Sequence, residues 1–462
     1  MNLLDLLRQQ EGKTLEFKSD IPQSDGLLRT VVAFGNTAGG VILLGVKDGS
    51  REVCGVEDPV LMEERLANLI MNGVKPQLVP EVEILPWRKT HVVAVVVHLS
   101  PNRPHHVTKL GVPGGVFVRV GSTNRKVDEG LLAELERSKK PSTFDEEPMS
   151  ELDSEAIDFR AVSESFASIR KLKRSDLRTL RLTAHHQGRD VPTVGGMILF
   201  GADRLRHFPD AWIQVGQFAG SDRTRILDTA EIKELPIIAI EHAMVFIRRH
   251  LTKGLLIGEG RHVEKWNVPP EAVREAVINA VVHADYSQRG SPIRVAIYED
   301  RLEVDSPGLL PVGVTIDEIL KGLSKLRNRV LGRVFHELGL IEQWGSGIQR
   351  MVVACREAGL DGPAFEELGT QFRVTLFTNQ RVRPTVAEAD KPIVALLAQE
   401  QGLSTQDIAS KVRRSTRATR MRLIGLVSRG IVVEVGTSPN DPRRRYYLAD
   451  EVRPVAGAGR AE

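Results

Sequence analysis

Apolar and polar residues alternate over Thr14–Lys18, a two-residue period that predicts a half-buried β-strand. The pattern changes to a helical period over about Gly26–Asn36, and a pair of glycines then precedes an apolar strand at Val41–Val46. Asp48-Gly49 has the composition of a hairpin turn, and another strand is predicted at Val116–Val120. Residues 1–140 are therefore expected to form one module of mixed helix and strand.

Near the C-terminus, three short helical patterns are followed by two strand-like segments. Ser404 is suited to cap the second helix, and Gly430 to end the third. The predicted helices cover 391–399, 405–411 and 415–429, and the predicted strands cover 431–435 and 445–448, joined by the turn-rich segment 436–442. Helix, helix, helix and hairpin is the order of a winged helix, which we place at 391–450.

The middle of the chain lies between two polar linkers, at 139–153 and 379–390. Residues 154–260 mix helical patterns with short strands, predicted at Met197–Phe200 and Ala211–Phe218, and receive no chemical role. Residues 261–380 contain a strong helix, two paired strands and a final strand. The fold class expected for the whole chain is multidomain α+β.

Composition limits the function classes. The 462 residues carry a formal net charge of only +3, so any nucleic-acid contact must come from local patches. The two cysteines, Cys54 and Cys355, have no partner at metal-ligand spacing and are expected to be reduced thiols. The longest apolar runs are too short to span a bilayer, and the first residues have no signal-peptide core. A soluble cytoplasmic protein is expected.

The predicted winged helix carries the clearest local charge. Between Lys391 and Ala449 there are eleven Lys or Arg residues and four Asp or Glu. The cations cluster at the start of the third helix and on the wing: Arg413, Arg414, Arg417, Arg420, Arg443, Arg444 and Arg445. Phosphates attract such cations, which predicts binding of double-stranded DNA, and paired half-sites would suit a homodimer. The alternative is a protein-interaction module with a solvated basic face.

A polar stripe marks the helix predicted at 271–284. Glu275, Asn279 and His283 are spaced one turn apart, with small and apolar residues on both sides. Such a stripe faces a cavity or a buried network. A carboxylate one turn from an amide can position a water while the amide oxygen binds a magnesium ion on phosphates.

Two glycine-containing segments follow this helix. Asp305-Ser-Pro307-Gly308 ends a strand, and Trp344-Gly345-Ser346-Gly347-Ile348 opens a helix whose bare amides phosphates can approach. In this order the pieces resemble the histidine-kinase-like (GHKL) ATPase fold, in the divergent form of RecG-related transcriptional regulators. The resemblance implies ATP and magnesium as cofactors.

The resemblance also assigns roles to individual residues. Glu275 matches the general base, Asn279 the magnesium ligand and Asp305 the adenine-reading acid, while Gly308, Gly345, Gly347 and the polar His283 complete the predicted nucleotide site. One departure is that Pro307 stands where the family has a glycine. The alternative is a degenerate pocket kept for packing or dimerisation. The family is named after the ATP-dependent helicase RecG, but this sequence has no Gly-x-x-x-x-Gly-Lys-Ser/Thr phosphate loop, which strand-separating motors usually need, so we expect no strand separation.

The N-terminal module resembles the Schlafen AlbA-like domain, through Glu11–Lys18, Ala33–Gly40 and Val118–Ser122. The resemblance implies nucleic-acid binding, with Arg119, Arg125 and Lys126 as phosphate contacts. It also implies a rival activity, a metal-dependent nuclease using Glu11, Glu16 and Asp48. Against this, Glu16 can simply pair with Lys18 on its own strand.

Together these features predict a bacterial-type DNA-binding transcriptional regulator whose DNA affinity is modulated by ATP. The alternatives are the nuclease and a stand-alone ATPase.

Overall fold

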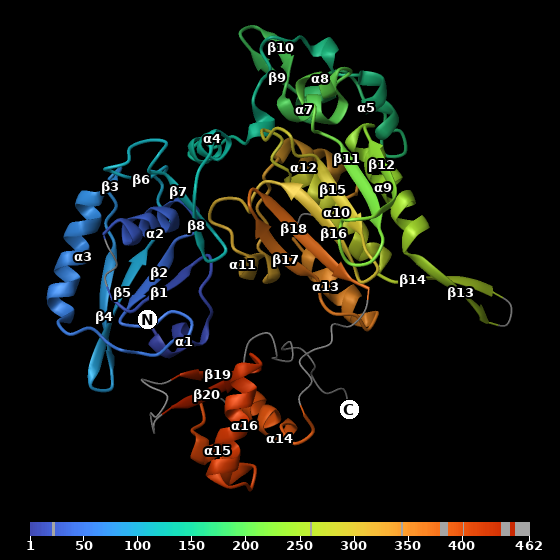
Figure 1. Ribbon diagram of the computed structural model, residues 1–462. Helices are drawn as coiled ribbons and strands as arrows, with labels where there is room; N and C mark the ends of the chain where they lie inside the picture. The colour runs from blue at the N-terminus through green and yellow to red at the C-terminus, as the bar shows by residue number, and fades with distance from the viewer. Residues whose placement is uncertain are drawn as a thin grey trace. The chain divides into compact units, whose positions relative to one another are not determined.

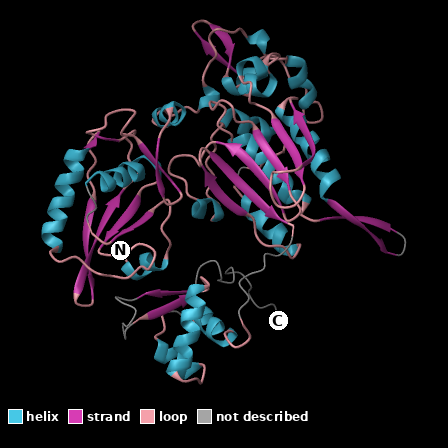
Figure 2. Ribbon diagram, viewed as in Figure 1, coloured by secondary structure: helices cyan, strands magenta, loops and turns pink. Residues whose placement is uncertain are grey.

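The computed structural model describes residues 1–20, 24–258, 261–342, 345–378, 387–400, 402–435 and 444–448. The chain divides into two compact units (Figures 1 and 2): Met1–Val127 together with Val382–Glu462, and Asp128–Arg381. Both units mix helices and strands, which confirms the multidomain α+β fold predicted from the sequence. Every helix in the described ranges is too short or too polar to cross a membrane.

The first unit contains a four-stranded sheet in the order β1-β2-β5-β4, with β1 and β2 parallel and the other pairs antiparallel. Its strands are β1 (Leu15–Lys18), β2 (Gly40–Leu44), β4 (Glu81–Trp87) and β5 (Thr90–Val97). Helices α2 (Ser24–Thr37) and α3 (Pro59–Gly73) bury one face of the sheet, where Ile42 and Leu44 lie. Helix α1 (Leu3–Arg8) packs on the other face, against Leu43. The alternation of β2 thus supplies two separate cores.

Short strand pairs complete this module. They are β3 (Val74–Lys75) with β6 (His106–Val107), and β7 (Phe117–Val120) with β8 (Thr123–Lys126). Asn36, fully buried at the end of α2, donates to the carbonyls of His105 and Phe117 at 2.9 and 3.0 Å and accepts from the His105 amide at 2.7 Å. The Ala33–Gly40 motif therefore clamps distant segments together.

The predicted order of three helices and two strands is present near the C-terminus. The elements are α14 (Lys391–Gln399), α15 (Thr405–Lys411), α16 (Thr416–Ser428), β19 (Val432–Val435) and β20 (Arg445–Leu448). They enclose their own core, and Val435 and Tyr447 of the strand pair also pack against α1 of the same unit. The guanidinium of Arg8 lies 4.1 Å from the centre of the Tyr447 ring. The turn 436–442, residues 379–386 of the predicted linker, and the end of the chain from residue 449 lie outside the described residues.

The second unit is built on a six-stranded sheet in the order β12-β11-β15-β16-β18-β17. Only the β11–β15 pair is parallel. The strands are β11 (Ile213–Phe218), β12 (Ile226–Ile232), β15 (Ile293–Ile297), β16 (Arg301–Pro307), β17 (Ala364–Leu368) and β18 (Gln371–Phe377). Helices α9 (Pro236–Leu251), α10 (Pro270–His283) and α13 (Gly347–Glu357) share its main core (Figure 1).

Smaller elements surround this sandwich. The helices are α4 (Glu129–Arg137), α5 (Phe159–Ser165), α6 (Asp176–Thr179), α7 (Val194–Phe200), α8 (Arg204–His207), α11 (Ile316–Leu320) and α12 (Arg329–Glu337), with 3-10 turns at Phe144–Glu146 and Ser154–Ala156. Two hairpins complete the unit, β9 (Thr183–His186) with β10 (Arg189–Pro192) and β13 (Thr252–Gly258) with β14 (Arg261–Trp266).

Two sequence predictions for this unit differ from the structure. Met197–Phe200 is not a strand but the end of helix α7, all seven residues of which are buried. A short, wholly apolar run has no period to distinguish strand from helix, and Thr193 caps this one by accepting from the Gly196 amide. The boundary placed at residue 260 also divides one structure, because β11 and β12 lie in the same sheet as β15 and β16.

A tertiary cap fixes the start of α12. The fully buried Asp145 accepts hydrogen bonds from the backbone amides of Arg329, Val330 and Leu331 at 3.0, 2.6 and 3.0 Å. These amides would otherwise lack partners at the helix N-terminus. The segment before α12, which borders the site described next, is thereby held in place.

Candidate functional site

The polar stripe of α10 faces a cavity. Glu275, Asn279 and His283 line it from the helix, and Val304 and Ser306 line it from β16. The segment between β16 and α12 covers it with Leu309, Leu310, Pro311, Val314, Ile319, Leu323, Ser324, Lys325 and Leu326, which we name the cover segment. The cavity has a volume of about 130 Å³. The stripe predicted from the helical period is therefore brought to one internal surface.

The predicted glycines line the same cavity. Gly308 has φ +104°, and a Cβ there would lie 2.9 Å from the Asp285 Cβ. Gly345 has φ +67°, a conformation that few other residues adopt. A Cβ at Gly347, the first residue of α13, would overlap the Glu275 carboxylate. A larger residue there would displace the end of the Glu275 side chain, because α13 begins in contact with α10 at this point. Trp344 lies outside the described residues.

In this conformation both carboxylate oxygens of Glu275 already have partners. The Asn279 amide donates to its Oε1 at 3.0 Å, and Arg350 of α13 pairs with its Oε2 at 3.2 Å. Arg350 also pairs with Glu342. The sequence analysis did not identify Arg350 as a site residue. The available signal was a cation one helical turn after Gly347. Among the described residues, the Asn279 amide oxygen has no hydrogen-bond partner, so it is available to a cation.

The donor set suits a magnesium-bound nucleotide, but the cavity as it stands is smaller than sites for molecules of that size, which usually span about 300–1,000 Å³. Binding therefore requires the cover segment to move and the Arg350–Glu275 ion pair to open.

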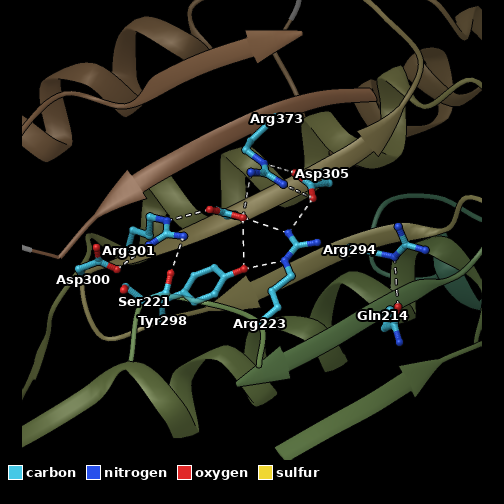
Figure 3. A network of polar contacts seen from close by, with 10 residues as sticks. Gln214, Ser221, Arg223, Arg294, Tyr298, Asp300, Arg301, Asp305 and Arg373 are labelled. Carbon is cyan, nitrogen blue, oxygen red and sulfur yellow. Dashed lines mark hydrogen bonds and ion pairs between the residues drawn. The ribbon is translucent and has the colours of Figure 1, made fainter. Parts of the chain in front are cut away.

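Asp305 is the clearest correction to the predicted site. Residues alternate along β16, so Val304 and Ser306 face the cavity while Asp305 points to the opposite face of the sheet. There Arg373 donates to its two oxygens at 2.6 and 2.9 Å, and Arg223 pairs with it at 3.1 Å (Figure 3). Asp305 thus belongs to a buried ionic network with Glu303, and it does not face a base bound in the cavity.

We expect Asp305→Ala to lower the free energy of unfolding by about 2 kcal/mol, because Arg223 and Arg373 each lose one of their two carboxylate partners and keep Glu303. Affinity for magnesium–ATP should not change. Ser306→Ala is the matched neighbour, since it alters the cavity face and leaves the network intact. Calorimetric unfolding and nucleotide titration of both variants test this. A loss of nucleotide affinity in Asp305→Ala at unchanged stability would restore the adenine-reading role.

His283 predicts a pH dependence of stability. Burial lowers its pKa to about 4, and the charge of Arg327 acts in the same direction. In the unfolded chain the pKa is near 6.5, so the unfolded state binds the proton more readily. The contribution of His283 to the free energy of unfolding is fully present above pH 6.5. It decreases by about 3 kcal/mol as the pH falls toward 4. His283→Gln should remove that part of the profile in urea unfolding at several pH values. Parallel profiles for variant and wild type would contradict it.

In the N-terminal module, Arg119 is not a surface phosphate contact. Its side chain is 1% exposed, donates to the Gly12 carbonyl at 3.0 Å and to Asn124 at 2.9 Å, and pairs with Glu16. Sequence reasoning could not see this burial, because the partner Glu16 is 103 residues away. Arg125 and Lys126 are exposed on β8, as a nucleic-acid contact requires.

The three carboxylates of the rival nuclease hypothesis do lie near one another. Burial raises the pKa of Glu11, and the nearby Glu16 and Asp48 raise it further, with a side-chain hydrogen bond between Glu11 and Asp48. Glu16, however, already pairs with both Arg119 and Lys18. Across the described ranges, no group of three or more His, Cys, Asp or Glu side chains is arranged to hold a metal ion.

The cations near the C-terminus divide into two groups. Arg413, Arg417 and Arg420 are exposed around the start of α16, and Arg414 is half-buried. Arg444 is instead buried and pairs with Glu434 at 2.8 Å, so the prediction of a backbone contact there is wrong. Arg445 is about half exposed but pairs with Asp407 at 3.1 Å. Arg443 lies outside the described residues.

Two protein families match parts of this chain. Residues 11–128 match the family described as "Schlafen, AlbA_2", and residues 290–376 match "Putative ATP-dependent DNA helicase recG C-terminal", a histidine-kinase-like ATPase family. The chain therefore carries an AlbA_2 segment and a RecG-type ATPase-like segment. No curated protein matches it.

Two solved structures are similar to this chain. The DIP2311 protein from Corynebacterium diphtheriae is 21% identical, with 94% of this chain and 92% of that chain covered and a TM-score of 0.45. The N-terminal domain of a "Putative ATP-dependent DNA Helicase RecG-related Protein" from Nitrosomonas europaea is 26% identical, with 27% and 92% covered and a TM-score of 0.22. At these TM-scores neither structure assigns a function to this chain.

Proposed function

We propose that this protein is a DNA-binding transcriptional regulator of the cytoplasm, and that magnesium–ATP bound between α10 and α13 changes its affinity for DNA. The observation that carries the proposal is the exposed cationic face of α16, inside a helix–helix–helix–strand–strand segment of winged-helix order. Duplex DNA would be the partner, read by two copies of the chain on paired half-sites.

The surface of α16 supports reading of a major groove. Arg417 and Arg420 lie in its first two turns, where the free amides of the helix also favour phosphate. Met421 and Ile424 continue the same face and are 67% and 48% exposed. Apolar side chains beside arginines suit the thymine methyl groups and guanine edges of a major groove. The alternative, a basic face that is only solvated, does not explain these exposed apolar side chains.

The nucleotide half of the proposal rests on α10. Asn279 has an amide oxygen available for magnesium, and Glu275 lies one turn away. Arg350 offers a cation at the end of the cavity where α13 begins. Glu275 would act as general base once Arg350 turns to the nucleotide phosphates, in the manner of a residue that orients water.

The metal-dependent nuclease is the second candidate, favoured by the contact of Glu11 with Asp48. It requires Glu16 to leave Arg119, which would unpair a buried guanidinium. The regulator proposal needs no such rearrangement.

The test is fluorescence anisotropy with labelled duplex DNA, with and without saturating magnesium–ATP, and with parallel assays for cleavage and phosphate release. Binding that changes with ATP supports the proposal. Binding that is the same in both conditions removes the switch and leaves a DNA-binding protein. Cleavage abolished by Glu11→Gln with Glu16→Gln would identify the nuclease, and phosphate release without DNA binding the ATPase.

A further inference from the structure

The second unit contains another recess, separate from the α10 cavity. It lies between the end of α4 with the turn after it and the segment that leads into α12, and its volume is about 590 Å³. This size is within the range of small-molecule sites. None of the roles discussed above uses it.

The recess is rich in cations. Five cationic side chains line it, against two carboxylates: Arg137, Lys140, Lys325, Arg327 and Arg329, and Glu134 and Asp285. Both carboxylates already have partners, since Glu134 pairs with Arg327 and Asp285 accepts from the Ser287 hydroxyl at 2.6 Å. The lining therefore carries a net positive charge, which favours an anionic ligand.

The present contacts of Arg137 and Arg329 are mainly with neutral groups. Arg137 donates to the neutral Ser287 hydroxyl at 2.9 Å and lies over the Phe144 ring. Arg329 donates to the Pro141 carbonyl at 2.7 Å, with Glu146 at 3.7 Å. Arg327 is 9% exposed, and its buried Nε has no hydrogen-bond partner among the described residues. A buried donor without a partner is costly unless a ligand satisfies it.

The remaining walls indicate which kind of anion fits. Pro141, Phe144, Pro311, Val312 and Leu326 give the recess apolar sides. A DNA backbone has no use for apolar walls, whereas a small organic molecule with one phosphate group uses both the walls and the cations.

We propose that this recess binds a small phosphorylated organic molecule, with its phosphate held by Arg137, Lys140 and Arg329. The site also adjoins the cover segment, because Pro311, Ser324, Lys325 and Leu326 line both cavities. A ligand here would touch the segment that must move for the α10 cavity to open. The inference concerns a separate site and does not depend on ATP binding.

Titration calorimetry on the full chain with phenyl phosphate, a phosphate monoester with an apolar ring, tests the proposal. We expect binding to one site, with phenol alone giving none. Arg137→Gln with Lys140→Gln should weaken binding by about tenfold or more, because charge-assisted hydrogen bonds are lost. Lys139→Gln, which removes an exposed cation that does not line the recess, should leave binding unchanged.

Asn279→Ala separates this site from the nucleotide cavity, and phenyl phosphate affinity should survive that change even if ATP binding fails. Should the double variant melt at a lower temperature, Arg329→Gln replaces it, because that side chain is 53% exposed. Absence of binding to the wild type, or equal affinities in wild type and recess variants, would overturn the proposal. Displacement of phenyl phosphate by duplex DNA would assign these cations to nucleic acid instead.

Discussion

Replacing Arg417 and Arg420 with alanine is expected to lower the affinity for duplex DNA by about two orders of magnitude. Both side chains lie on the exposed face of α16, and each phosphate or base contact contributes roughly 1–3 kcal/mol. The slope of log affinity against log salt should also decrease by about two, because two fewer counterions are released. Anisotropy titrations at several salt concentrations measure both quantities.

The matched controls lie in the same C-terminal segment. Lys391→Ala removes an exposed cation from α14 and should leave DNA affinity almost unchanged. Arg444→Gln breaks the buried pair with Glu434 and should lower stability more than it changes the salt slope. If all three variants lose affinity equally, general charge rather than the α16 face is responsible, and the segment is better explained as an interaction module.

Periodicity along the chain was enough to find the elements that carry the site. The helical period placed Glu275, Asn279 and His283 on one face of α10, and the structure brings all three to one cavity. Strand alternation likewise predicted β1, and the apolar run after Gly39-Gly40 predicted β2. Such patterns depend only on neighbours along the chain, so they can be recognised without knowing the fold.

The roles predicted for Asp305 and Arg119 differ from the structure for another reason. The motif around Asp305 was recognised, but which face of β16 turns toward α10 depends on how that strand pairs in the sheet. Arg119 appeared to be a surface cation because its partner Glu16 lies on a strand far away in the sequence. Burial of a charge depends on such tertiary partners, which a single sequence does not reveal.

The division of the middle region also depended on tertiary pairing. β11 and β12 lie ahead of the boundary drawn at residue 260, yet β11 pairs with β15 in parallel. Parallel neighbours are separated by a crossover, and here it includes α9 and α10. The boundary at residue 260, which was drawn from composition, therefore separates strands that belong to one sheet.

Glu275→Gln is expected to slow ATP turnover by about 100-fold or more, while magnesium–ATP binding is retained or strengthened. The amide cannot act as a base, which accounts for the loss of turnover. It also removes one of the two carboxylates that pair with Arg350, so the guanidinium can turn more easily to the nucleotide phosphates.

Asn279→Ala, in contrast, is expected to weaken the binding of magnesium–ATP itself. It removes the amide oxygen assigned to magnesium, and binding should weaken by about tenfold or more in the presence of the metal. Arg350→Ala should weaken binding as well, because Glu275 and Glu342 would then lie uncompensated beside the phosphates. Equilibrium binding of a fluorescent ATP analogue and a phosphate-release assay, run on the three variants together, separate binding from turnover. If none of the three changes either quantity, the cavity between α10 and α13 holds no nucleotide, and the polar stripe serves only to join those two helices.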